Sequence, residues 1–350
     1  MQEVIRQFSE TIRKAAAEGT QLRIRGSGSK DFYGLVLIGD VLDTLALTGI
    51  VDYEPTELVM TARAGTPLRD AEKALADRGQ MLAFEPPHFG PHATLGGCIA
   101  SGFSGPRRAA SGSARDFVLG VRMVNGLGEE LRFGGQVMKN VAGYDLSRLL
   151  TGSFGTLGLI TEVSLKVLPI PEKELTLSFE LDGAQAIASM NMWAAKPLSL
   201  SASCHVDRVL YVRLSGASPA VTATHKKLGG EVVHDGAVFW QSIREQTHPL
   251  FEGAPALWRF SIKSTAAPLG LGRQIVEWNG SLRWVAEDLD PALAFDAAHR
   301  AEGHATVFRG GNKRHGIQQF SPGLLAVHKK LKRAFDPHGI LGPGRIHADF

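Results

Sequence analysis

Three glycine-rich turns in the first half of the chain have the composition of a site for an anionic ligand. They are Arg25–Lys30 (RGSGSK), Ala93–Gly97 (ATLGG) and Thr151–Gly158 (TGSFGTLG). Glycine permits positive φ and lets a ligand approach the main chain closely. The Ser, Thr, Arg and Lys side chains between the glycines can hydrogen-bond to phosphate. Three such turns in one chain indicate one extended anionic ligand.

The two common nucleotide-binding motifs are absent from the sequence. No segment matches G-x-x-x-x-G-K-[ST], and no segment matches G-x-G-x-x-G, because only Gly26 and Gly28 precede Lys30 in the first turn. We therefore expect a dinucleotide held by some other fold.

The composition excludes several classes of protein. A chain of 350 residues fits two domains, and 44% hydrophobic with 21% charged residues is ordinary for a soluble protein. The net charge of +3 is too small to indicate nucleic acid as a partner. Cys98 and Cys204 supply neither a disulfide framework nor a four-cysteine iron–sulfur site. With no secretory signal and no long apolar run, the sequence predicts a cytoplasmic protein.

The elements that must position the turns follow from hydrophobic periodicity. We expect a helix over residues 3–18, a strand over 21–25, a strand over 57–64, a helix over 68–78, a hairpin over 117–133, a helix over 144–150 and a strand over 157–168. After Pro171 glycine is sparser, and the pattern to about residue 309 is strand, helix, hairpin, helix. This predicts an α+β layer with an internal pseudo-repeat over 174–233 and 255–308. A basic amphipathic helix is expected over 324–334.

Four motifs together resemble the vanillyl-alcohol oxidase / p-cresol methylhydroxylase family. They are Ala93–Gly97, Lys139–Leu146 (KNVAGYDL), Gly152–Thr161 (GSFGTLGLIT) and Asp336–Arg345 (DPHGILGPGR), in the family's order and spacing over nearly the whole chain. The resemblance implies an α+β fold, with a two-part FAD-binding domain of that type and an α+β cap domain that contains an antiparallel sheet. It implies an FAD-binding domain over 1–171, a cap over 172–309, and a segment over 310–350 that returns to the FAD domain.

The turns and the resemblance together predict the residues that bind one FAD. These are Arg25, Gly26, Ser27, Gly28, Ser29, Lys30, Thr94, Leu95, Gly96, Gly97, Ser101, Gly102, Gly143, Tyr144, Asp145, Gly152, Gly155, Gly158, Ile160 and Arg345. Taken alone, Arg25 and Lys30 are more simply explained as solvated charges, and it is the other motifs that favour a contact with phosphate. Covalent-flavin members often carry a His in the first glycine turn, where this chain has Ser29. The resemblance therefore implies non-covalent FAD.

Two further segments are similar to the FAD-binding subunits of bacterial glycolate oxidases. They are Leu22–Gly34 (LRIRGSGSKDFYG) and Gly303–Arg309 (GHATVFR). This similarity implies a complex that oxidises glycolate, a small 2-hydroxy acid, to glyoxylate. Its other members would be a paralogous flavoprotein subunit and an iron–sulfur subunit, at the inner face of the cytoplasmic membrane. The basic helix, with Lys329, Lys330, Lys332 and Arg333, is one candidate docking surface, and a solvated helix face explains it equally well.

The catalytic residues stay open at this stage. The related α-hydroxy-acid dehydrogenases have Glu at the position of Phe154 and a metal-binding H-x-G-D-G-N-x-H stretch, of which only Gly303–Thr306 has a counterpart here, so no metal is expected. Oxidising a hydroxy acid needs a base for the hydroxyl and a cation for the carboxylate. Arg309 and His315 are weak candidates within a basic turn that solvation explains as well. Arg107 and Arg108 are ambiguous between phosphate contact and solvation.

Two other functions fit the same residues. One is a self-sufficient FAD-dependent 2-hydroxy-acid dehydrogenase, which would oxidise its substrate without partners. The other is a scaffold subunit that holds flavin but passes no electrons.

Overall fold

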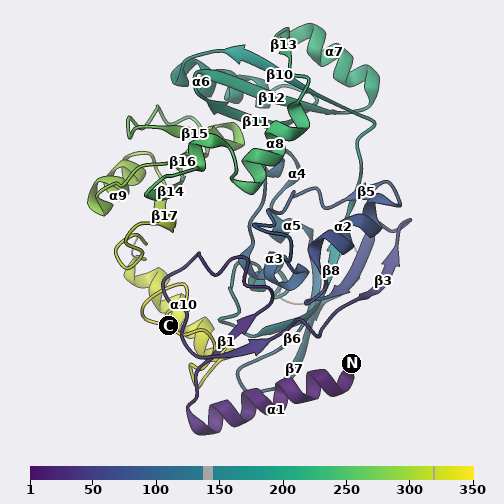
Figure 1. Cartoon of the computed structure of the whole chain (residues 1–350), viewed down its shortest axis with the longest axis vertical. Helices are drawn as coiled ribbons and strands as arrows, with labels where there is room; N and C mark the ends of the chain where they lie inside the picture. Colours follow the sequence, from purple (N-terminus) through teal and green to yellow (C-terminus); the bar gives the residue numbers. More distant parts are fainter. Residues whose placement is uncertain (137–144, 318–319) are drawn as a thin grey trace. The chain divides into compact units, whose positions relative to one another are not determined.

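A computed structural model describes residues 1–136, 145–317 and 320–350, and the chain divides into two compact units (Figure 1). Unit 1 comprises Met1–Phe103, Ser113–Ile170 and Gln319–Phe350; unit 2 comprises Ser104–Gly112 and Pro171–Gln318. The chain thus enters unit 2 twice, whereas the sequence analysis placed the cap in one segment over 172–309. The short first segment belongs to unit 2 because Arg107 forms an ion pair with Glu174 and the indole N–H of Trp278 donates to the carbonyl of Gly105 at 3.0 Å.

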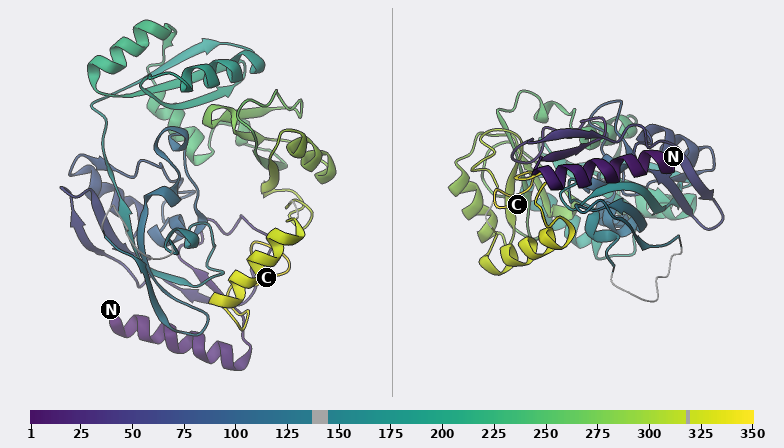
Figure 2. Two further views of the ribbon diagram at one scale, coloured as in Figure 1. Left: turned by 180° about the vertical axis from the view of Figure 1, so that it is seen from behind. Right: turned by 90° about the horizontal axis from the view of Figure 1, so that it is seen from below.

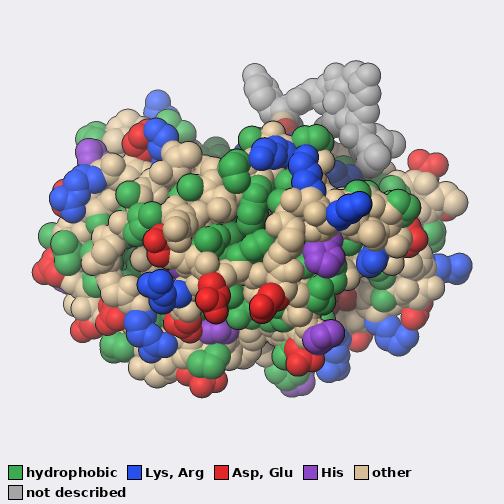
Figure 3. All heavy atoms as spheres, turned by 90° about the horizontal axis from the view of Figure 1, so that it is seen from above, with side chains coloured by type: hydrophobic (Ala, Val, Ile, Leu, Met, Phe, Trp, Pro, Cys, Tyr) green, Lys and Arg blue, Asp and Glu red, His purple; other side chains and the backbone are tan. Residues whose placement is uncertain are grey.

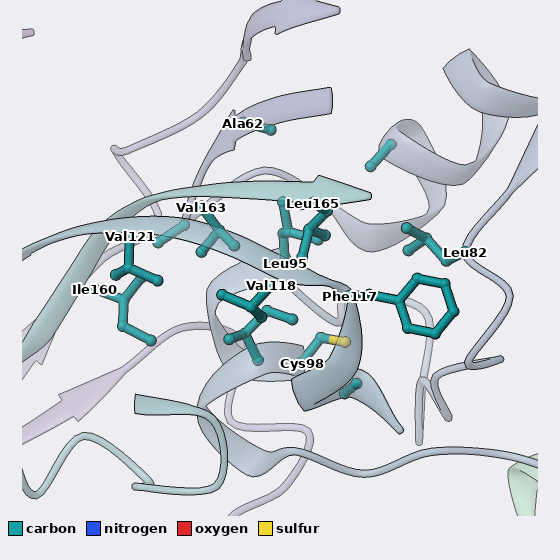
Figure 4. Packing of buried hydrophobic residues seen from close by; sticks show 14 of the residues in the cluster. Ala62, Leu82, Leu95, Cys98, Phe117, Val118, Val121, Ile160, Val163 and Leu165 are labelled. Carbon is teal, nitrogen blue, oxygen red and sulfur yellow. The ribbon is translucent and has the colours of Figure 1, made fainter. Parts of the chain in front are cut away.

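The main sheet of unit 1 has five antiparallel strands. Their order is β3 (Ile50–Glu54), β4 (Val59–Arg63), β8 (Leu159–Lys166), β6 (Val118–Val124) and β7 (Glu130–Gly134). Helices α2 (Leu68–Ala76), α3 (Leu95–Ser101) and α5 (Ala114–Phe117) contribute residues to the core of this sheet. Figure 4 shows Leu95, Cys98 and Phe117 packed with strand residues such as Val163 and Leu165. Strand β8 is the central strand of this sheet, and all of its residues except Glu162 and Lys166 are buried.

A second layer of unit 1 joins the two ends of the chain. Helix α1 (Gln2–Glu18) buries Phe8, Ile12 and Ala15 on one face against the parallel pair β1 (Leu22–Arg25) and β2 (Asp40–Asp43). The tail that follows helix α10 (Pro322–Phe335) lies beside β1, because the N–H of Leu22 donates to the carbonyl of Ile340 at 2.7 Å. Residues far apart in sequence therefore share one small core.

The strands β5 (Gln80–Met81) and β9 (Leu168–Pro169) form a separate, short antiparallel pair.

Unit 2 contains an eight-stranded antiparallel sheet in the order β13-β10-β12-β11-β15-β16-β14-β17. The first half is β10 (Lys173–Glu180), α6 (Gly183–Ala194), β11 (Leu200–Val206), β12 (Val209–Gly216), α7 (Ser218–Leu228) and β13 (Glu231–Val232). The second half is β14 (Ala256–Ser261), β15 (Gln274–Glu277), β16 (Leu282–Val285), α9 (Pro291–Arg300) and β17 (His304–Gly310). Helices α4 (Arg108–Ser111) and α8 (Gly236–Glu245) and the short 3-10 turns η2 (Pro249–Phe251) and η3 (Trp278–Gly280) complete the unit.

The two halves of this sheet repeat one strand order. Read inward from the edge strand β13, the first half has the order β13-β10-β12-β11. Read inward from the opposite edge strand β17, the second half has the order β17-β14-β16-β15. Each half therefore places its strands in the order fourth, first, third, second. The expected pseudo-repeat is therefore present in the topology. The difference is that α6 follows β10, whereas the loop 262–273 follows β14. Figure 2 shows the first half with its two helices, α6 and α7, which bury residues in one shared core.

The loop 262–273 is held by a buried arginine. Arg283 of β16 is 0% exposed and donates from its three nitrogens to the carbonyls of Gly280, Ala267 and Ala266 at 2.6–3.1 Å. Burial lowers the pKa of this guanidinium to about 10. Two carbonyls of the loop thus receive hydrogen bonds from Arg283, whereas the carbonyls of α6 receive them from main-chain N–H groups within the helix.

Most predicted elements agree with the structure. The helix over 3–18, the hairpin over 117–133 and the helix over 324–334 are confirmed as α1, β6–β7 and α10. The helix predicted over 144–150 is wrong: residue 144 lies outside the described part, and the rest holds only the 3-10 turn η1 (Arg148–Leu150). Among the described residues, no helix is both long enough and apolar enough to cross a bilayer. Figure 3 shows charges of both signs interspersed on one face.

Candidate functional site

A cavity in unit 1 brings the three glycine turns together. Counted together with the open solvent at its mouth, its space is about 940 Å³. Its lining comes from β1 and the first turn, the loop 36–38, the start of α3, the third turn, and the tail at Gly342 and Arg345. All of these segments belong to unit 1.

The first turn follows directly from β1 and is shaped by its glycines. Gly28 has φ +77°, a conformation that favours glycine. A Cβ on Gly26 would lie 2.5 Å from Thr94 Oγ1, so the first turn touches the second one through a position without a side chain. Arg25 Nε donates to Asp31 Oδ2 at 2.9 Å across the turn.

The second turn begins helix α3. Thr94 caps this helix, since its Oγ1 accepts from the N–H of Gly97 at 3.2 Å. A Cβ on Gly96 would lie 2.5 Å from the Cβ of Ala64 and 2.9 Å from its carbonyl oxygen, so Gly96 lets α3 pack against the residue that follows β4. The sequence analysis expected this glycine to serve ligand approach. Gly97 fits that expectation better, because it also lines the cavity and its Cβ would meet only Thr94 Oγ1, at 3.1 Å.

The third turn is docked on α3 by main-chain hydrogen bonds. The N–H groups of Gly152 and Phe154 donate to the carbonyls of Ile99 and Ala100 at 3.1 and 2.8 Å. Phe154 and Gly155 have φ +51° and +77°. Phe154 lines the cavity and stacks on Tyr33 with ring centroids 5.0 Å apart. This turn therefore gives the cavity an aromatic wall.

The tail closes another side of the cavity. Arg345 is 8% exposed, donates through Nη2 to the carbonyl of Lys30 at 3.0 Å, and lies over the Phe154 ring at 5.5 Å. The N–H of Leu35 donates to the carbonyl of Arg345 at 3.0 Å. Burial lowers the pKa of Arg345 below its usual value, and Asp31 opposes this effect. The tail is thus fastened to the end of the first turn and to the loop that follows it.

The charged side chains of the lining have an excess of positive charge. Among the described lining residues, the charged ones are Arg23, Arg25, Lys30, Arg345 and a single acidic residue, Asp31. Lys30 is 8% exposed, and its Nζ donates to Ser29 Oγ and to the carbonyl of His88, both at 3.2 Å. Clustered cations of this kind favour an anionic ligand.

The cavity suits FAD in charge and in backbone access. The pyrophosphate would find glycine main chain and cations, and the apolar residues Val36–Ile38 offer contact to a ring system. Among the described lining residues there is no His, Cys or Tyr, the side chains that most often tether a flavin.

Most of the predicted FAD-binding residues meet at this cavity. The residues that line it are Arg25, Gly26, Ser27, Gly28, Ser29, Lys30, Thr94, Gly96, Gly97, Ser101, Gly155, Gly158, Ile160 and Arg345. Leu95, Gly102, Asp145 and Gly152 are not in the lining; Leu95 lies in the core and Gly152 contacts α3. Gly143 and Tyr144 fall outside the described residues.

The sequence analysis missed several lining residues, among them Arg23, Val36–Ile38, Thr44 and Gly342. Arg23 could have been found, because residues i and i+2 of a strand share a face and Arg25 was already assigned. The others come from loops whose path no periodicity predicts.

The candidate catalytic residues belong to unit 2. Arg309 of β17 donates through Nη2 to Gln246 Oε1 at 3.0 Å, and burial lowers the pKa of its guanidinium. His315 is exposed after β17. Neither lines the cavity of unit 1. Arg107 pairs with Glu174, and Arg108 lies over the Trp278 ring at 4.3 Å, so neither is a solvated charge. In the part of the chain that the structure describes, no group of three or more His, Cys, Asp and Glu could hold a metal ion.

Sequence comparisons agree with this construction. The FAD binding domain family matches residues 3–134, and the C-terminal domain of FAD linked oxidases matches residues 310–346. The glycolate oxidase subunit GlcE of Escherichia coli (strain K12) is 47% identical over 341 residues, which is 97% of this chain and 96% of that protein. The chain therefore belongs to the same family as GlcE. It is therefore an FAD-binding member of the FAD-linked oxidoreductases.

More distant relatives share only part of their length with the chain. The glycolate oxidase subunit GlcD of Bacillus subtilis (strain 168) is 37% identical over 128 residues, 37% of this chain and 27% of that protein. The mitochondrial D-lactate dehydrogenase [cytochrome] 1 of Saccharomyces cerevisiae (strain ATCC 204508 / S288c) is 32% identical over 172 residues, 47% of this chain and 29% of that protein. A solved structure of alkyldihydroxyacetonephosphate synthase matches with a TM-score of 0.67 and 15% identity, covering 96% of this chain and 73% of that one. This match confirms the predicted vanillyl-alcohol oxidase type of fold.

Proposed function

We propose that the chain is the FAD-binding subunit of a glycolate oxidase complex that oxidises glycolate to glyoxylate. The near-full-length similarity to GlcE carries this proposal, since 47% identity extends over 97% of the chain. The complex would also contain a paralogous flavoprotein, as the similarity to GlcD suggests, and an iron–sulfur subunit that receives the electrons. It would lie at the inner face of the cytoplasmic membrane, bound there through its partners.

We place FAD in the cavity of unit 1, bound without a covalent link. The main chain of Gly26–Gly28 and Gly97 would donate to the pyrophosphate, and Arg23, Arg25 and Lys30 would offset its charge. The aromatic wall of Phe154 and Tyr33 would keep water from one side of the ligand. When bound, FAD supplies the capacity to accept two electrons from the substrate.

The groups that handle the hydroxy acid belong outside the cavity lining in this proposal. The described lining contains no His, and its only carboxylate, Asp31, is paired with Arg25. Arg309, as the cation for a carboxylate, and His315, as the base, remain the candidates within this chain. The paralogous subunit is the other source of such groups.

The alternative is a self-sufficient FAD-dependent 2-hydroxy-acid dehydrogenase. The similarity to a D-lactate dehydrogenase favours it, although that similarity covers 47% of this chain and 29% of the relative. The flavin-holding scaffold is the other alternative.

The decisive experiment compares the purified chain with the chain co-expressed with its two partners. We expect FAD in the supernatant after acid precipitation, little glycolate oxidation by the chain alone with a dye acceptor, and restored oxidation by the complex. Flavin that stays with the precipitate would contradict non-covalent binding. Robust turnover by the chain alone would favour the self-sufficient dehydrogenase, and a complex in which this chain's flavin is never reduced would favour the scaffold.

A further inference from the structure

A buried lysine of helix α10 lies behind two walls of the cavity. Lys332 is 5% exposed, and its Nζ donates to three oxygens: the carbonyl of Thr156 at 2.7 Å, the carbonyl of Leu341 at 2.6 Å and Asp336 Oδ2 at 2.7 Å. The sequence analysis included Lys332 in a basic docking surface. The structure corrects this, because the ammonium group faces the interior of unit 1.

Two of the three acceptors belong to segments that line the cavity. Thr156 lies between Gly155 and Gly158 of the third turn, and Leu341 precedes Gly342 of the tail. Lys332 itself is not in the lining. One ammonium group therefore joins two walls whose residues are about 190 positions apart in sequence, without contacting the ligand space itself.

Asp336 extends the same arrangement along the tail. This carboxylate is 1% exposed and accepts from the N–H groups of Ile340 at 3.2 Å and Leu341 at 2.8 Å as well as from Lys332. The pair thus fixes where the tail begins. A buried charge pair whose hydrogen-bonding capacity is met by main chain gives position, because no water is there to replace either partner.

We infer that Lys332 is a positioning residue for the FAD cavity, which sets the third glycine turn and the tail at the spacing that FAD requires. The inference rests on the proposed place of FAD in this cavity. Its consequence is a coupling: seating of the tail and binding of FAD favour each other, and by linkage each strengthens the other by the same factor.

The test titrates FAD-free protein with FAD and follows the quenching of flavin fluorescence. Lys332→Met keeps the length of the side chain and removes the charge, and Lys330→Met is the matched control on an exposed position of the same helix. We expect the Kd for FAD to rise at least tenfold for Lys332→Met and to stay within twofold for Lys330→Met. Lys332→Arg, which restores a buried cation with several donors, should recover part of the affinity.

Hydrogen exchange separates positioning from a general loss of structure. In FAD-free Lys332→Met, exchange should rise in residues 152–158 and 336–345 and stay unchanged in β4 and β8. A Kd within twofold of wild type, or exchange raised equally in β4 and β8, would overturn the inference. If wild-type protein binds no FAD, the proposed function fails at its cofactor site, whereas wild-type binding with an unaffected Lys332→Met variant removes the positioning role alone.

Discussion

Units 1 and 2 both bury an arginine, and the two are used differently. In unit 2, Arg283 donates from all three nitrogens to backbone carbonyls of neighbouring segments. In unit 1, Arg345 donates to the carbonyls of Lys30 and Asp31 and still lines a cavity with three further cations. In unit 2 the buried guanidinium therefore satisfies backbone carbonyls of the unit itself. In unit 1 the buried guanidinium is one of four cations in the described lining of an open cavity. That excess of positive charge indicates an anionic ligand in a way that a count of arginines does not.

Gly96→Val should have the largest effect on unit 1. Its Cβ would overlap Ala64, so α3 must move from its packed position, and overpacking this close to backbone atoms costs about 3 kcal/mol or more. We expect a lower midpoint of urea unfolding together with loss of bound flavin. A variant of wild-type stability with full flavin occupancy would show that the contact with Ala64 is dispensable.

Arg283→Met should have the next largest effect, and it should be confined to unit 2. Removing the guanidinium leaves three carbonyls without a donor, at a cost of about 2–3 kcal/mol. Thermal unfolding should show this loss while the Kd for FAD stays unchanged. Arg300→Met, on an exposed arginine paired with Asp296, is the control and should change stability by less than about 0.5 kcal/mol. A large loss of FAD affinity in Arg283→Met would show that the units are energetically coupled.

Gly97→Ala is the clean probe of the cavity itself. Gly97 lies in a helix and its Cβ would be 3.1 Å from Thr94 Oγ1, so the fold should accept alanine. The added methyl group would project into the space for the ligand, and we expect the Kd to rise about tenfold, which is about 1.4 kcal/mol. Gly323→Ala, in the first turn of α10 with no atoms near its Cβ, controls for helix propensity. Equal affinities of the two variants would move FAD away from α3.

Arg309→Met tests whether unit 2 takes part in the chemistry. Loss of the bond to Gln246 should cost about 1 kcal/mol of stability and leave FAD binding as it is. Steady-state kinetics of the assembled complex then decide. A fall of more than a hundredfold in kcat with folded, flavin-loaded protein would make Arg309 part of the active site, and unchanged kinetics would assign the chemistry to another chain.

The smallest effect is expected for alkylation of the Cys98 thiol in the native protein. Burial raises the pKa of this thiol to about 12, so the reactive thiolate fraction at pH 8 is about 10⁻⁴. Because the thiolate is lost as pH falls through this raised pKa, iodoacetamide should leave Cys98 of the native protein unmodified at pH 8, as mass spectrometry of the labelled peptide would show. Rapid labelling of Cys98 in FAD-free protein would mean that α3 loosens without its ligand.

The sequence predicted the parts of unit 1 that depend on local pattern. Helix α1, the hairpin β6–β7 and the glycine turns follow from periodicity and turn chemistry, which act over a few residues. Lys332 was misplaced because one of its acceptors, the carbonyl of Thr156, lies 176 residues away in sequence. The same reason explains Gly96, whose neighbour Ala64 belongs to a distant strand end.

The architecture of unit 2 was foreseen only as a repeat of strand and helix patterns. The second half has the loop 262–273 where the first half has helix α6, and Arg283 holds this loop. The local sequence pattern does not indicate that one guanidinium will satisfy the carbonyls of Ala266 and Ala267. Arg107 lies within the predicted FAD-binding domain over 1–171, whereas its partner Glu174 lies beyond that boundary.

The tail beside β1 has a consequence for how the protein matures. Residues 22–30 emerge early from the ribosome, yet their partners at 340–345 are made only after all of unit 2. Until then, strand β1 lacks its neighbour, and the cavity lacks Gly342 and Arg345. If FAD occupies this cavity as we propose, its loading must wait for the synthesis of residues 340–345, and a nascent chain that stalls within unit 2 would have all three glycine turns but no completed cavity.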